Sequence, residues 1–61
     1  MKKINYKSRY DFTKNTTEII ILYDKARIFS VEIYGQLQPP AIAQYAAEAI
    51  ELLKEKGVIK S

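Results

Sequence analysis

The spacing of apolar residues changes once along this chain, at Pro39-Pro40, and that change limits the folds open to it. Before the two prolines, apolar and polar residues alternate, as in β-strands with one buried face. After them, apolar residues recur at helical spacing, as on the buried side of an amphipathic helix. Strands followed by one helix predict an α+β fold, a three-stranded antiparallel meander packed against a single C-terminal helix.

The three expected strands cover residues 3–13, 17–23 and 27–35, with a tight turn between each pair. The first and third runs alternate between apolar and polar residues, which is typical of strands with one solvated face. The second run is apolar at both parities and rich in β-branched residues. It is therefore predicted to be the central strand, which needs cover on both faces.

The two turns fix the predicted register of the sheet. A two-residue turn at Lys14-Asn15 and a three-residue turn at residues 24–26 place Glu18 opposite Glu32, a like-charge pair that weakens this register. The pairs that follow are Phe12–Thr17, Tyr10–Ile19, Ser8–Ile21, Tyr6–Tyr23, Tyr23–Arg27, Ile21–Phe29 and Ile19–Val31. This register places apolar residues together on one face of the sheet, namely Ile4, Tyr6, Tyr10, Phe12, Ile19, Ile21, Tyr23, Phe29, Val31 and Ile33.

A helix is expected over residues 40–56. Pro40 suits the first helical position, where its missing N–H costs nothing, and Pro39 should hold the entering chain extended. The helix should stop at Gly57 in a Schellman arrangement, with Val58 against its last turn and residues 58–61 as a short tail. Its apolar face carries Ile42, Tyr45, Ala46, Ala49, Ile50 and Leu53.

The composition limits the chemistry of the chain. Its 61 residues make one small domain, residues 1–61, and they include neither Cys nor His. A disulfide, the usual zinc ligands, a His base and a Cys nucleophile are therefore missing. We expect no enzyme, no catalytic residue, no cofactor and no metal site. No stretch predicts a signal peptide or a membrane span, and a cytoplasmic location is the default expectation.

A sheet with one helix has one face left bare, and that face is the candidate partner or dimer interface. The predicted register puts Ile20, Leu22, Ile28 and Tyr34 there as an apolar patch, and such patches favour binding to another protein. A register shifted by one residue would instead bury these side chains. The sequence predicts an interaction module, either a homodimer or an inhibitor or regulator of a larger protein, that uses this face or an edge strand.

Nucleic-acid binding is the alternative hypothesis. Lys3, Lys7 and Arg9 lie close together in a chain with a net charge of +3, interleaved with Tyr6 and Tyr10. Such a mixture can contact phosphates and stack on bases without reading sequence. On a regular strand, however, the tyrosines and the cations point to opposite faces, which favours the tyrosines as core residues.

Overall fold

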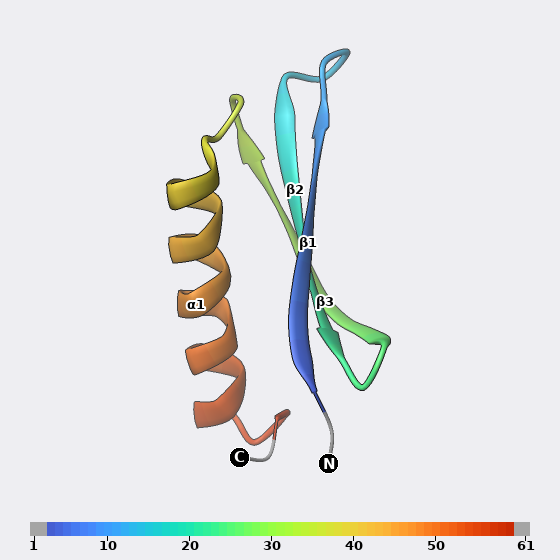
Figure 1. Ribbon diagram of the computed structural model, residues 1–61, viewed down its shortest axis with the longest axis vertical. Coiled ribbons are helices and arrows are strands. Elements are labelled where there is room, and N and C mark those ends of the chain that lie inside the picture. Colours follow the sequence, from blue (N-terminus) through green and yellow to red (C-terminus); the bar gives the residue numbers. More distant parts are fainter. Residues whose placement is uncertain (1–2, 60–61) are drawn as a thin grey trace.

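The structure, a computed structural model that describes residues 3–59, has three strands and one helix in the predicted order (Figure 1). The sheet is antiparallel in the order β1-β2-β3, so β2 is the central strand and the other two form its edges. The α+β prediction is confirmed, with element bounds that differ by a few residues. These bounds are β1 Ile4–Asp11, β2 Thr16–Tyr23, β3 Ala26–Tyr34 and α1 Pro39–Glu55.

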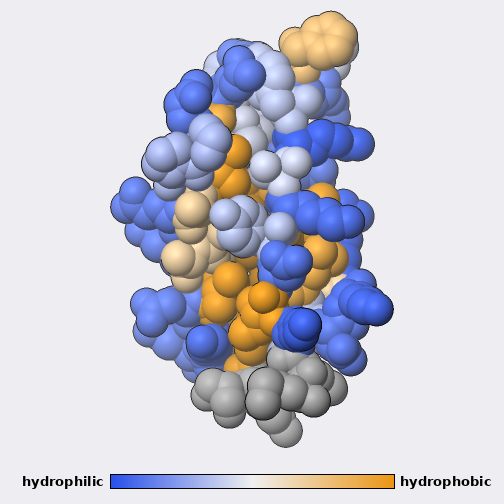
Figure 2. All heavy atoms as spheres, in the orientation of Figure 1, coloured by the Kyte–Doolittle hydropathy of each residue, from blue (hydrophilic) through white to orange (hydrophobic). Residues whose placement is uncertain are grey.

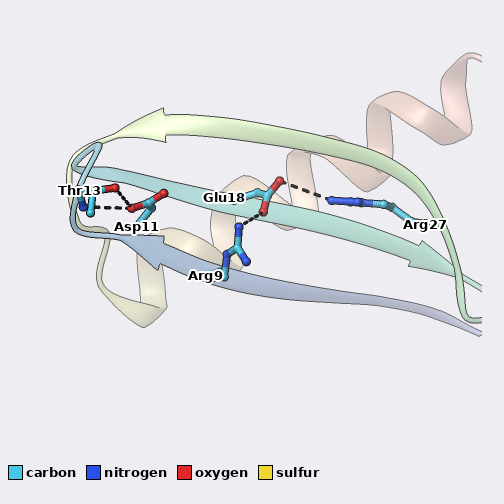
Figure 3. A network of polar contacts seen from close by, with 5 residues as sticks. All are labelled: Arg9, Asp11, Thr13, Glu18 and Arg27. Atoms are coloured by element: carbon cyan, nitrogen blue, oxygen red, sulfur yellow. Dashed lines mark hydrogen bonds and ion pairs between the residues drawn. The ribbon is translucent and has the colours of Figure 1, made fainter.

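The first hairpin turn is longer than predicted. Residues 12–15 all belong to the connection, and Asn15 closes it with a left-handed φ of 54°. Asp11 stabilises the loop, because its carboxylate accepts hydrogen bonds from the backbone N–H of Thr13 at 3.0 Å and from the Thr13 hydroxyl at 2.5 Å (Figure 3). The hydroxyl of Tyr10 also donates to Asn15 Oδ1 at 2.6 Å.

This longer loop moves the β1–β2 register by two residues, so the predicted pairs between these strands are wrong. Because the shift is even, every side chain keeps its predicted face. Phe12 is the exception, since it leaves the sheet and is exposed in the loop. The observed pairs are Tyr10–Thr17, Ser8–Ile19, Tyr6–Ile21 and Ile4–Tyr23.

The loop carries a pH-dependent contribution to stability. The Thr13 hydroxyl, followed by the Thr13 backbone N–H, holds the pKa of Asp11 below its ordinary value, since both donate to the ionised form. A lowered pKa stabilises the fold above the ordinary pKa of Asp, and this contribution is lost as pH falls through the lowered pKa. We therefore expect Asp11→Ala to lower the free energy of unfolding at neutral pH and much less in acid.

Urea titrations at about pH 7 and about pH 2 test this expectation, because they lie on either side of the ordinary Asp pKa. Thr13→Val, which removes the hydroxyl donor, should reduce the same difference between the two pH values. An equal loss of stability at both pH values in Asp11→Ala would show that the side chain acts by packing and not by charge.

The second hairpin has a two-residue turn where three residues were predicted. Asp24 and Lys25 both have positive φ, 54° and 69°, as in the primed turns that match the twist of paired strands. A β-bulge in β3 compensates for the missing turn residue, since Leu22 pairs with Arg27 while Ile21 pairs with Phe29. The predicted pairs Ile21–Phe29 and Ile19–Val31 are thus confirmed, and Tyr23 pairs with Ala26 instead of Arg27.

Helix α1 covers one face of the sheet and packs chiefly against β2 (Figure 1). It begins at Pro39, one residue earlier than predicted, because Gln38 is already the extended residue that precedes a proline. In Figure 2, drawn with β1 nearest to the viewer, apolar side chains stay visible between the helix and the sheet. The core consists of buried residues from β2, the helix and the segment after it, namely Ile19, Ile21, Ala46, Leu53 and Ile59.

The helix ends in the predicted Schellman motif. Gly57, with φ 79°, donates its N–H to the Lys54 carbonyl, and Val58 donates to the Leu53 carbonyl at 2.9 Å. Within the predicted short tail, the turn sends Ile59 back into the core, where it is 2% exposed, while Val58 is 49% exposed. Residues 60 and 61 of that predicted tail lie outside the described residues.

Candidate functional site

The face of the sheet opposite α1 carries Glu18 (Figure 3). The other even-numbered residues of β2 share that face, because alternate residues of a strand point to the same side. Thr17, Ile19 and Ile21, on the helix side, are buried, whereas Ile20 and Leu22 are only half-buried. This is the predicted bare face, and it has an apolar centre on the central strand. Half-buried aliphatic residues in the middle of a sheet leave apolar surface that a partner could cover.

Leu22 lies in a hollow on this face, with a volume of about 440 Å³. The other residues that line the hollow are Lys3, Asn5, Lys7 and Lys25. Asn5 is paired directly with Leu22 across β1 and β2, which places Lys3, just before β1, and Lys7, within β1, on either side of that pair. The hollow therefore combines an apolar side chain with three lysines around it.

Backbone contacts place the lysines of this hollow. The left-handed turn at Asp24 and Lys25 follows directly after β2, and the N–H of Asp24 donates to the carbonyl of Lys3 at 2.8 Å. This bond joins the start of β1 to the β2–β3 turn. Lys25 and Lys3 consequently come together beside Leu22, although they are far apart in the sequence.

The predicted cation Arg9 belongs to a different part of the face. Its guanidinium lies 3.7 Å from a Glu18 carboxylate oxygen, and Arg27 reaches the other oxygen of the same carboxylate at 3.6 Å (Figure 3). These two cations offset the like-charge pair of Glu18 and Glu32, which the structure confirms as neighbours in the register. Both ion pairs found within residues 3–59 involve Glu18, and neither involves a lysine of the hollow.

The sequence-predicted interface is only partly brought together. Ile20 and Leu22 are neighbours on the open face, and Leu22 joins Lys3 and Lys7 from the alternative prediction. Ile28 packs against the core cluster at the bulge. Tyr34 is 81% exposed but pairs with Thr16, six positions along β2 from Leu22 and so roughly 20 Å away.

Sequence reasoning missed two lining residues of the hollow, Asn5 and Lys25. A two-residue turn at Asp24-Lys25 would have placed Lys25 at the end of β2 beside Leu22. Asn5 shared the parity of the cations, but only the corrected β1–β2 register pairs it with Leu22. Tyr6 and Tyr10 lie on the helix side, opposite Ile21 and Thr17, as their parity predicted.

Comparison of the chain with models of known protein families, with curated proteins and with solved structures finds no match. Over residues 3–59, no helix has both the length and the apolar character of a membrane span. The same stretch holds no group of three Asp, Glu, His or Cys side chains arranged to bind a metal ion.

Proposed function

We propose that this chain is a non-catalytic interaction module that binds a segment of a larger protein on its open sheet face. The observation that carries this proposal is the hollow around Leu22, in which an apolar side chain is surrounded by Lys3, Lys7 and Lys25. The preferred segment has acidic side chains beside an aliphatic one, because carboxylates complement the lysines and apolar contact covers Leu22.

The charge distribution on the open face supports an acidic partner. Glu18 already engages Arg9 and Arg27, so the cations nearest to it are paired within the chain. Lys3 and Lys25 lie at the other end of the β1–β2 pair, and Lys7 lies opposite Ile20 near its middle. No carboxylate is among the residues that line their hollow. Carboxylates of a partner that approach these lysines would speed association, and the same lysines would repel basic partners.

The nucleic-acid alternative has less support on the same face. Base stacking needs aromatic side chains beside the cations. Tyr6 and Tyr10 point to the helix side, and the third cation of that prediction, Arg9, is paired with Glu18. Of the three predicted cations, Lys3 and Lys7 remain in the hollow. Leu22 lies between them, and its aliphatic side chain favours contact with a protein side chain over contact with a base.

The test uses a fluorescently labelled peptide of alternating Glu and Leu and measures binding by anisotropy. We expect the double variant Lys7→Gln with Lys25→Gln to raise Kd about tenfold, which corresponds to about 1.4 kcal/mol. Leu22→Thr, which keeps β-propensity and removes aliphatic surface, should also weaken binding. The matched control is Lys14→Gln with Lys54→Gln, which removes the same charge from the hairpin loop and the helix and should change Kd less than about twofold.

Equal losses in both double variants would contradict a specific site, since they would mean attraction by net charge alone. An oligothymidylate measured alongside the peptide tests the alternative. Tighter binding of the oligonucleotide, with affinity falling steeply with salt, would replace the protein-binding proposal by nucleic-acid binding.

A further inference from the structure

The two edges of the sheet differ in how open they are to a new strand. Edge β1 carries Lys7 and Arg9 and is preceded by Lys3, and charged residues are a common protection against edge pairing. The backbone N–H of Tyr6 is also satisfied within β1, since it donates to Asn5 Oδ1 at 2.8 Å. Edge β3, nine residues long, carries the charged residues Arg27 and Glu32 and the bulge at Ile28, and from Phe29 to Ile33 it has apolar residues at alternate positions.

An apolar groove of about 270 Å³ runs between this β3 edge and the helix. Leu52, on the helix, is 46% exposed there, and Tyr45 is similarly exposed. The groove is continuous with the core, since its strand residues also pack against the buried cluster. The lining residues are Phe29, Val31, Ile33, Tyr45, Glu48, Ala49 and Leu52.

We infer that a second copy of this chain pairs antiparallel along β3 and covers the groove. The midpoint of Ala26–Tyr34 is Ser30, so pairing about Ser30 overlaps the two strands most fully, with regular pairing from Phe29 to Val31 and the bulge at Ile28 on either side of it. It sets Phe29 opposite Val31 of the second copy, an apolar pair on the helix side. It also sets Glu32 opposite Ile28 of the second copy, beside Arg27 of that copy.

Among the registers that two-fold symmetry allows, the charged residues favour the one centred on Ser30. A pairing centred on Glu32 would bring two carboxylates face to face, which is unfavourable. Centring on Ser30 instead places each Glu32 near the Arg27 of the other copy. The Arg27 side chain is 59% exposed, so it can bridge this Glu32 and the Glu18 of its own chain, and the contact occurs twice in the two-fold arrangement. The β3 edge is therefore complementary to itself in charge as well as in apolar pattern.

The same symmetry closes the groove. A two-fold axis perpendicular to the sheet keeps both helices on one face of a continuous six-stranded sheet. The groove of one copy then meets the groove of the other, and Leu52 and Tyr45 lose their exposure to water. This added burial suits a chain of 61 residues, because domains of this size bury a smaller fraction of their surface on folding than larger domains do.

Sedimentation velocity between about 1 and about 200 μM measures the association, since this range brackets a micromolar Kd. We expect a dimer in the wild type and at least about tenfold weaker dimerisation in Leu52→Glu, which puts a charge in the groove. The control, Ala47→Glu, adds the same charge at an exposed helix position outside the groove and should leave the dimer intact. A wild type that stays monomeric, or equal effects of both variants, would overturn the inference.

A crosslink tests the register without depending on groove variants. The chain has no Cys, so Ser30→Cys introduces a single thiol, and pairing about Ser30 brings the two copies within disulfide range. Ser8→Cys, on exposed edge β1, is the matched control. Rapid oxidation to a covalent dimer in Ser30→Cys alone is expected, and preferential crosslinking of Ser8→Cys would overturn the β3 interface.

These outcomes are independent of the proposed open-face function, because the groove and the Leu22 hollow share no residue. Leu52→Glu should release monomers that still bind the acidic peptide. Loss of peptide binding in that variant, with the fold retained by circular dichroism, would show that the second copy completes the open-face site and that the two surfaces are not separate.

Discussion

Ile59→Ala is expected to lower the free energy of unfolding by about 2–5 kcal/mol, as large-to-small changes in cores do. Ile59 lies beyond the end of the helix, yet it is 2% exposed and belongs to the buried cluster with Ile19, Ile21 and Leu53. Small domains rarely draw more than about 3–5 kcal/mol from one core. The variant should therefore be close to its unfolding midpoint at room temperature, which urea denaturation followed by circular dichroism would measure.

Val58→Ala is the matched control, because it removes apolar atoms from the neighbouring residue that is 49% exposed. Its effect should stay within about 0.5 kcal/mol, as is usual for surface positions. Similar losses in the two variants would contradict the inward turn of Ile59, because the backbone hydrogen bonds of the Schellman motif are the same in both.

Thr17→Val is expected to cost about 1–3 kcal/mol, although the two side chains have nearly the same shape. Thr17 is buried, and its hydroxyl donates to the Gly35 carbonyl at 2.7 Å while it accepts from the Leu37 N–H at 3.1 Å. Valine would leave both backbone groups without this partner. The hydroxyl thus connects the start of the central strand to the segment that leads into the helix.

Two control variants separate the hydroxyl from packing. Thr17→Ser keeps both hydrogen bonds and should retain most of the stability that Thr17→Val loses. Thr16→Val, at a half-buried neighbour, should change stability much less. A Thr17→Val protein as stable as the wild type in thermal melts would show that water replaces the lost bonds at Gly35 and Leu37.

Secondary structure followed from local pattern, but turn lengths did not. The alternation before Pro39 and the helical spacing after it gave the element order and the side-chain faces, because a period of two or of 3.6 depends only on neighbouring residues. The loop after Asp11 was mispredicted, since its length depends on hydrogen bonds from Thr13 that the residue types alone do not specify. The bulge at Ile28 likewise accompanies the two-residue turn, because the extra residue keeps Phe29 paired with Ile21.

The sequence predicted several residues of the candidate site but not that they lie together. The patterns gave Leu22 as a bare-face residue and Lys3 and Lys7 as cations of the same face, and the structure joins the three in one hollow. Lys25 could not be included, because it reaches the hollow only through the turn that follows β2. Arg9 could not be excluded, because its pairing with Glu18 depends on the two-residue shift of β1.

The sequence by itself determined the α+β order, the central place of β2 and the even-numbered face that carries Leu22, because apolar periodicity is a local property of the chain. The tertiary structure alone decided which residues meet: Lys25 with Lys3, Thr17 with Gly35 and Leu37, and Ile59 with the core. These contacts join residues distant in sequence. Their formation depends on register and on chain reversal at the turns, where small differences in backbone geometry move whole strands.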